Sequence, residues 1–221
     1  MASTAPSSRR ARRAARGGGA SASARARHPR DRIHDAALEL FYDRGFHATT
    51  VRDIMGACDL TPGALYNHYG SKEDILYELV TESHDHLDAR IDAELAEAGE
   101  DPRERLRAVV TAFARFHSDE RRLAVVGTLE YRHLPEAQRR EVINRRLRHR
   151  RLLERILADG VEADLFSLPP TKGGSTAKVT ATALANVAMR LSEAFGPDAK
   201  IGHGDLAAHH AELALHSVLK R

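Results

Sequence analysis

A short stretch of the chain combines small residues with hydrogen-bonding side chains. Three of its positions are small or polar, which would let a helix backbone approach the major groove of DNA: Gly63, Ala64 and Asn67. Tyr66 and His68 add groups that can form hydrogen bonds, and Lys72 follows where an ammonium group could meet a phosphate. These residue types in this order indicate a DNA-binding surface.

The hydrophobic periodicity around this stretch predicts three helices joined by tight turns. The first helix should end at Gly45, since glycine suits a left-handed C-terminal cap. Thr50 and Asp53 form a capping-box pattern that begins a short second helix. Pro62 suits the first position of a third helix, which should extend to about Tyr69. Two short helices joined by a tight turn are typical of a helix-turn-helix, with the third helix as recognition helix.

The residues around the predicted turn form a longer pattern that resembles the TetR family of repressors. The pattern is Phe46-x-Ala48-Thr49-Thr50-Val51-x-Asp53-Ile54 followed by Leu60-Thr61-Pro62-Gly63-Ala64-Leu65-Tyr66-x-His68-Tyr69-x-Ser71-Lys72-Glu73. The resemblance implies a DNA-binding domain over residues 31–77. It implies contacts to the DNA backbone from Thr50, Thr61, Tyr66, His68 and Lys72, and a base-facing set of Gly63, Ala64 and Asn67. Leu65 and Tyr69 also belong to this pattern, but they can instead be interpreted as core residues that pack against the first two helices.

The first thirty residues are strongly basic, whereas the rest of the chain is mildly acidic. They contain eight arginines and no acidic residue, so the remaining chain has 26 basic and 31 acidic side chains. Their Ala, Ser, Gly and Arg content without an apolar period predicts a disordered arm over residues 1–30. Arg25, Arg27 and Arg30 could follow the DNA into an adjacent minor groove. The alternative interpretation is a solvated tail with no function.

The rest of the chain shows only helical periodicity, so the sequence predicts an all-α protein with about nine helices. The resemblance implies that residues 78–221 form an effector-binding and dimerisation domain. Its last two helices, expected at about 176–195 and 204–220, would pair across a two-fold axis in a homodimer. Such a dimer would hold two recognition helices about 34–36 Å apart and bind a palindromic operator in double-stranded DNA.

In TetR-family members the central helices enclose a pocket for a small-molecule effector. The candidate pocket residues are Phe113, Phe116, His117, Val126, Glu130, Tyr131 and Met189, and each has an equally good interpretation as a core residue. A second resemblance, to acyl-CoA-sensing regulators of fatty-acid and steroid catabolism, rests on Glu130-Tyr131-Arg132-x-Leu134-Pro135 with Arg139, Arg145 and Gly160-x-x-x-x-x-Phe166. It implies that Arg145, Arg146 or Arg148 could attract the pyrophosphate of the ligand. The lack of tryptophan and the few aromatic residues argue against a large planar ligand.

Other function classes have weaker signals. The tightest cluster of candidate metal ligands is His84, Asp85, His86 and Asp88, which lacks a third ligand at helical spacing. No nucleophile with a base is evident, so we expect no enzyme activity, no cofactor and no metal site.

Cys58 is the only cysteine, which excludes an intramolecular disulfide, and we expect it to be buried. No apolar run approaches the roughly 18 residues that cross a bilayer, so we expect a cytoplasmic protein without a membrane partner.

The remaining alternative is a multidrug-responsive or broad-specificity DNA-binding regulator that takes a different hydrophobic ligand. Its DNA binding would be driven mainly by the arginine-rich arm, and would therefore depend strongly on salt. A non-specific binder should lose its discrimination between operator and random DNA, whereas a repressor keeps an affinity gap of several kcal/mol.

Overall fold

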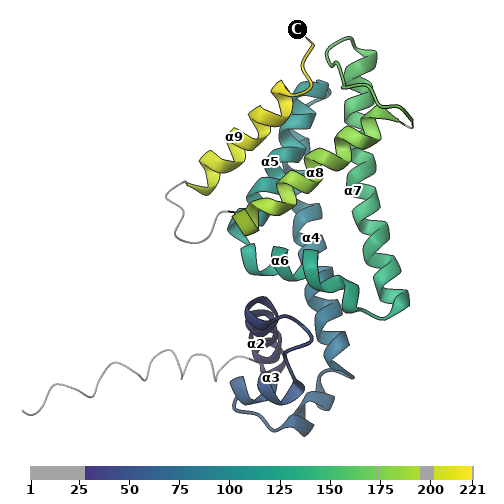
Figure 1. Ribbon diagram of the computed structural model, residues 1–221. Coiled ribbons are helices and arrows are strands. Elements are labelled where there is room, and N and C mark those ends of the chain that lie inside the picture. Colours follow the sequence, from purple (N-terminus) through teal and green to yellow (C-terminus); the bar gives the residue numbers. More distant parts are fainter. Residues whose placement is uncertain (1–27, 174, 195–201, 221) are drawn as a thin grey trace, which may run out of the picture.

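The computed structural model describes residues 28–173, 175–194 and 202–220 (Figure 1). Within these ranges the chain forms eight α-helices and two short 3₁₀ helices, and its one β-contact is an isolated bridge between Phe166 and Leu219. This confirms the predicted all-α fold. No helix in the described part of the chain is long and apolar enough to span a membrane.

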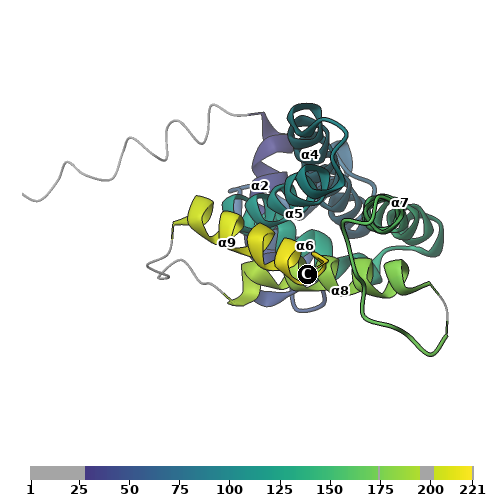
Figure 2. The ribbon, with the colours of Figure 1, turned by 90° about the horizontal axis from the view of Figure 1, so that it is seen from above.

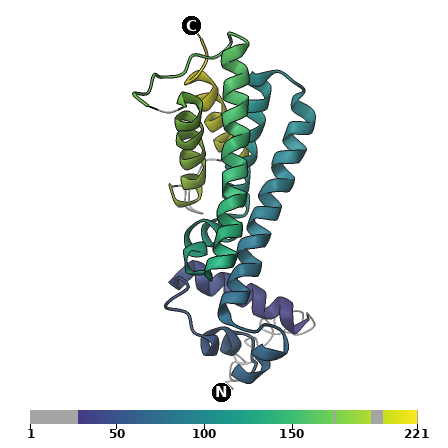
Figure 3. The same cartoon turned by 90° about the vertical axis from the view of Figure 1, so that its right-hand side faces the viewer.

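The helices form two parts that follow each other along the long axis of the molecule, a head and a second domain (Figure 1). The head consists of α2 (Pro29–Arg44), α3 (Val51–Ala57) and η1 (Pro62–Asn67). The second domain consists of α5 (Pro102–Asp119), α6 (Arg121–Leu129), η2 (Glu130–His133), α7 (Glu136–Glu162), α8 (Thr176–Ala194) and α9 (His203–His216). The long helix α4 (Lys72–Ala98) belongs to both, since it runs from the head along α7 (Figure 3).

The ends of the head helices follow the predicted capping residues. The N–H of Gly45, at a φ of 79°, donates to Phe41 O and ends α2. The Thr50 side chain accepts from the N–H of Asp53, whose carboxylate accepts from the Thr50 N–H, so the predicted capping box is present. Helix η1 ends at Asn67 rather than at Tyr69, because the N–H groups of the next two residues both turn back to the carbonyl of Leu65.

Two hydrophobic clusters divide the core. The lower one joins the head to α6 and to the start of α7, since Ile33 and Phe41 of α2 share it with Val126 and Val142. The upper one fills the space between α4, α5, α7, α8 and α9. Leu65 and Tyr69 are buried, in agreement with their second interpretation as core residues. Cys58 is also buried, and burial raises the pKa of its thiol.

Helices α8 and α9 lie together on one side of the second domain, packed against α5 (Figure 2). Their inner faces are buried at Ala181, Ala188 and Ala211, where small side chains allow close packing. Their outer faces carry exposed apolar residues. These are Val179 and Val187 on α8 and Leu213 on α9, the last of them 58% exposed.

Candidate DNA-binding surface and ligand cavity

The outer surface of η1 brings together the predicted base-facing residues. Gly63 and Asn67 are exposed, Ala64 is half-buried, and the side chain of Tyr66 is 69% exposed. A Cβ atom at Gly63 would meet no other atom within 4 Å, so the backbone here is open to a large partner. This surface is small, polar and accessible, as groove recognition requires.

Several residues predicted to contact DNA phosphates already bond within the head. The Thr50 hydroxyl donates to Asp53 Oδ2 at 2.6 Å, and this bond lowers the pKa of the Asp53 carboxyl. Lys72 Nζ donates to the carbonyls of Phe46 at 2.9 Å and Thr49 at 2.8 Å, and lies 3.9 Å above the Phe46 ring. Thr61 occupies the N-cap position of η1, but its side chain makes no capping bond.

The two arginines predicted to accompany the DNA have different positions. Arg27 lies outside the described residues. Arg30 belongs to the first turn of α2, where its guanidinium lies 4.6 Å from the centre of the Tyr69 ring. It also donates to the carbonyl of His68 and forms an ion pair with Glu78 of α4. These contacts connect the beginning of α2 with the beginning of α4.

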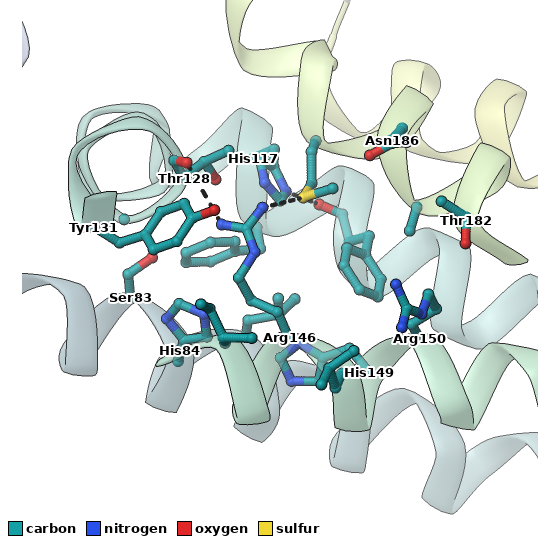
Figure 4. A pocket seen from close by; sticks show the side chains of 18 residues that line it. Ser83, His84, His117, Thr128, Tyr131, Arg146, His149, Arg150, Thr182 and Asn186 are labelled. Atoms are coloured by element: carbon teal, nitrogen blue, oxygen red, sulfur yellow. Dashed lines mark hydrogen bonds between the residues drawn. The ribbon is translucent and has the colours of Figure 1, made fainter. Parts of the chain in front are cut away.

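A cavity of about 230 Å³ lies in the second domain between α4, α5, α6, α7 and α8 (Figure 4). Its deep wall is fully buried at Phe113, Phe116 and His117, whereas Ile143 of α7 is 38% exposed and Asn186 of α8 is exposed. The cavity is therefore open between α7 and α8. Its lining consists of Ser83, His84, Leu87, Phe113, Phe116, His117, Gly127, Thr128, Tyr131, Ile143, Arg146, Leu147, His149, Arg150, Thr182, Ala185, Asn186 and Met189.

Six of the ten predicted effector-binding residues line this cavity, and four lie elsewhere. The six are Phe113, Phe116, His117, Tyr131, Arg146 and Met189. Val126 is buried in the lower cluster, and Glu130 accepts a hydrogen bond from the N–H of Phe46 at 3.2 Å. Arg145 pairs with Asp85 at 2.6 Å, and Arg148 is exposed.

Two arginines one helical turn apart on α7 line the cavity. Arg146 lies 4.6 Å from the centre of the Tyr131 ring and donates to Thr128 O and Met189 Sδ, each at 3.5 Å. Burial lowers the pKa of its guanidinium. The Nε of Arg150 is buried and has no hydrogen-bond partner among the described residues. Neither guanidinium pairs with a carboxylate in the described part of the chain, so the cavity has donors available for an anionic or carbonyl oxygen.

Three histidines line the same cavity, and only His117 was predicted to do so. The Nδ1 atoms of His84 and His117 lie 2.8 Å from the carbonyls of Val80 and Phe113, respectively. Burial lowers the pKa of each imidazole to about 4. His149 instead pairs through Nε2 with Asp88. The sequence pattern missed His84 and His149 because each lies within a run of polar residues, and packing alone turns them inward.

Helix η2 connects the cavity to the head. Tyr131 lines the cavity, whereas the neighbouring Glu130 accepts the hydrogen bond from Phe46 in the α2–α3 loop. The ring of His133 stacks on that of Phe46, with the ring centres 5.6 Å apart, and makes an edge contact with His47. Three residues of η2 therefore join the cavity wall to the head.

The described residues contain no group of three side chains that could hold a metal ion. In particular, the cluster from residue 84 to residue 88 is divided by its contacts. His84 faces the cavity, Asp85 pairs with Arg145, and Asp88 pairs with His149. The local chemistry of this helix is thus hydrogen bonding and ion pairing.

Two protein-family models match the chain. The model described as bacterial regulatory proteins, tetR family, matches residues 33–79, and the one described as tetracyclin repressor-like, C-terminal domain, matches residues 99–218. The HTH-type transcriptional repressor KstR2 of Mycobacterium tuberculosis is 30% identical over 138 residues, or 62% of this chain and 68% of that protein. KstR2 of Rhodococcus jostii is 40% identical over 82 residues, which are 37% of this chain and only 40% of that protein's length.

Solved structures agree with the family match. A regulatory protein in the tetR family from Rhodococcus RHA1 is 30% identical, with a TM-score of 0.78 over 88% of this chain and 99% of that chain. The structure of AibR in complex with isovaleryl coenzyme A and operator DNA has the same fold, with a TM-score of 0.72 over 84% of this chain and 97% of that chain, at 20% identity. The chain therefore belongs to the TetR family of DNA-binding transcriptional regulators.

Proposed function

We propose that this protein is a repressor that binds a palindromic operator as a homodimer and is released when an acyl-CoA thioester enters the cavity of the second domain. The observation that carries the proposal is the pair of guanidinium groups on α7, Arg146 and Arg150, in a cavity that also has a buried aromatic wall. A ligand with an apolar end and several anionic oxygens matches both features.

The size of the cavity limits which part of the ligand it holds. A cavity of about 230 Å³ exceeds the roughly 150 Å³ of an engineered cavity that binds benzene, so an acyl group fits. The coenzyme A part is too large and would extend through the opening between α7 and α8. In this orientation the arginines of α7 offer N–H donors to the thioester carbonyl and to phosphate oxygens.

The similar proteins support this ligand class without establishing it for this chain. AibR binds isovaleryl coenzyme A, a short branched acyl-CoA, and shares the fold. The second resemblance in the sequence points to the same class. Its predicted arginine positions are partly displaced, since Arg146 lines the cavity and Arg145 and Arg148 do not.

The outer faces of α8 and α9 support the proposed homodimer. Val179, Val187 and Leu213 form exposed apolar positions on two neighbouring helices, and burying them against a second copy would be favourable. Pairing through this side of the molecule would place two heads next to each other and two recognition helices about 34–36 Å apart. A palindromic operator with half-sites one helical turn apart fits such a dimer.

The experiment that tests this function is fluorescence anisotropy on DNA from the protein's own upstream region. The wild type is titrated onto the DNA in the presence of acyl-CoA thioesters of increasing chain length, with free coenzyme A as control. We expect release by one class of thioester and not by coenzyme A alone. The variant Arg146→Met should keep its operator affinity and lose the response.

Three results would overturn parts of the proposal. Specific DNA binding that no thioester changes would remove the acyl-CoA effector. Release by a neutral hydrophobic compound, equally strong in the wild type and in Arg146→Met, would favour a multidrug-responsive regulator. Absence of any preference for operator over random DNA would remove the repressor function itself.

A further inference from the structure

The deepest part of the cavity contains polar groups as well as hydrocarbon. His84 is 6% exposed and His117 is 2% exposed, and both line the cavity beside Phe113 and Phe116. The His117 ring packs edge-on against Phe116, with the ring centres 5.2 Å apart. Two imidazoles are thus held beside two aromatic rings in the wall of the cavity.

Contacts with the backbone fix which nitrogen of each ring carries the proton. A carbonyl oxygen can only accept, so the Nδ1 atoms that face Val80 O and Phe113 O must be the protonated ones. Both imidazoles are neutral at neutral pH, because burial holds their pKa near 4 and the Arg146 charge opposes protonation further. The Nε2 atom of each ring therefore presents a lone pair and acts only as an acceptor.

These acceptors have no donor partner within the described protein. The hydrogen bonds of the two rings are those made by Nδ1, and no described residue donates to either Nε2. A ligand that displaced water from either Nε2 without donating to it would leave a buried acceptor unpaired, at a cost of about 1–3 kcal/mol, so the wall favours a ligand that supplies a donor. A plain alkyl chain would cover the lone pairs without satisfying them.

We propose that the buried end of the effector carries a hydrogen-bond donor, such as a hydroxyl group, that donates to Nε2 of His84 or His117. This inference rests on the proposed function only in naming the ligand as the effector. A site that bonds a hydroxyl discriminates strongly against the analogue that lacks it, whereas an apolar pocket does so weakly. The two histidines would thus select hydroxylated acyl groups over acyl groups that lack a hydroxyl.

The test uses phenol and toluene, which have almost the same size and differ in one hydroxyl group. Both are small enough for the cavity, and neither needs coenzyme A or DNA. Dissociation constants are measured by NMR titration of the full-length protein. We expect phenol to bind at least about tenfold more tightly than toluene, since the reverse order is typical of a dry apolar cavity.

Variants identify the acceptor. His84→Leu and His117→Leu should reduce the preference for phenol about tenfold for whichever ring accepts the bond. His84→Gln offers an amide oxygen and should keep part of the preference, which separates hydrogen bonding from damage to the fold. His86→Leu, on the same helix but outside the cavity, is the matched control and should leave both constants unchanged.

The outcomes separate this inference from the proposed function. Toluene binding as well as phenol, binding of neither compound, or a preference unaffected by both leucine variants would overturn the donor proposal. Selective phenol binding together with operator affinity insensitive to every thioester would support the donor site and overturn the acyl-CoA effector. Release of the operator by an acyl-CoA whose acyl group lacks a hydroxyl, with toluene preferred over phenol, would do the opposite.

Discussion

The head and the cavity treat their polar groups in opposite ways. In the head, the ammonium group of Lys72 has two carbonyl acceptors and the Thr50 hydroxyl has the Asp53 carboxylate. In the cavity, Arg146 and Arg150 have no carboxylate partner among the described residues, Nε of Arg150 has no hydrogen-bond partner there, and the hydrogen bond of His84 is made by Nδ1. These polar groups of the head are therefore paired within the folded protein, whereas those of the cavity would find such partners only in a ligand.

This difference follows from what each region must recognise. A DNA-binding surface gains from being rigid before it meets its partner, because ordering it on binding would reduce the affinity. A cavity whose polar groups lack partners is stabilised by the molecule that supplies them, and so responds to its concentration. Four changes, taken from the largest expected effect to the smallest, test this contrast.

The largest effect concerns pH. An unfolded imidazole has a pKa near 6.5, whereas His84 and His117 in the folded protein have a pKa of about 4. Between these values the unfolded state binds protons first, so the stability is complete above about pH 6.5 and falls as the pH falls toward 4. At pH 5 each histidine should lower the free energy of unfolding by about 2 kcal/mol relative to pH 7.5.

Urea unfolding at pH 7.5 and at pH 5 measures this loss. The double variant His84→Leu, His117→Leu should show a smaller loss than the wild type by about 4 kcal/mol, because other histidines contribute equally to both proteins. Burial also lowers the pKa of His210, so some loss should persist in the double variant. Equal pH dependence in the two proteins would show that the cavity histidines are not buried as neutral groups.

The second effect is in the head. Lys72→Met removes both hydrogen bonds of Nζ and its contact with the Phe46 ring, so the carbonyls of Phe46 and Thr49 lose their donor. The free energy of unfolding should fall by about 2 kcal/mol. Lys172→Met, at an exposed loop position, is the control and should change it by less than about 0.5 kcal/mol.

Operator affinity measured on the same variant sharpens the contrast. If Lys72 is bonded within the head in the complex, then affinity and stability should decrease together. A large loss of affinity at unchanged stability would instead mean that the ammonium group leaves its carbonyls and contacts a phosphate, as the family pattern predicts. The ammonium group of Lys72 would then change its hydrogen-bond partners when the head binds DNA.

The third effect has the opposite sign. Arg146→Met removes a half-buried charge that has no carboxylate partner in the described structure, so the free energy of unfolding should stay the same or rise by about 1 kcal/mol. Arg145→Met breaks the pair with Asp85 and the bond to Thr81 O, and should lower it by about 1 kcal/mol. Urea unfolding of both variants at pH 7.5 tests this pair. Equal destabilisation would show that Arg146 is bonded as well as Arg145.

The same contrast explains what the sequence allows one to predict. The helix ends of the head are determined by neighbouring residues. Local sequence alone identifies the capping box at Thr50, the positive φ of Gly45 and the proline at the start of η1. These features located the recognition element to within two residues. They did not show that Lys72 folds back onto the α2–α3 loop, because its acceptors lie more than twenty residues earlier.

The lining of the cavity depends on how distant helices pack, and only some of the predicted residues belong to it. Aromatic residues on α5 were found because large apolar side chains on a helix face point inward. On α7 the charged residues follow each other, and only the packing decides that Arg146 faces the cavity while Arg145 pairs with Asp85. Glu130 was predicted to line the cavity together with Tyr131, but the 3₁₀ turn directs the two side chains to different regions.

That turn provides the smallest effect and the link between the two regions. Glu130→Ala removes the acceptor of the Phe46 N–H and should lower the free energy of unfolding by about 1 kcal/mol or less, because only one partly buried hydrogen bond is lost. Its main effect should be on communication. A ligand that moves Tyr131 would no longer shift the α2–α3 loop through η2, so the ligand-induced loss of operator affinity should shrink several-fold.

Three measurements separate this from a loss of ligand binding: the ligand affinity of the free protein, the operator affinity without ligand, and the operator affinity with ligand. Only the third should change appreciably in Glu130→Ala, and the control Glu162→Ala, at the far end of α7, should change none. If coupling is intact in Glu130→Ala, the signal uses another connection between cavity and head, such as α4, which carries His84 at the cavity and Lys72 in the head. The ligand would then change the operator affinity of the head through one continuous helix.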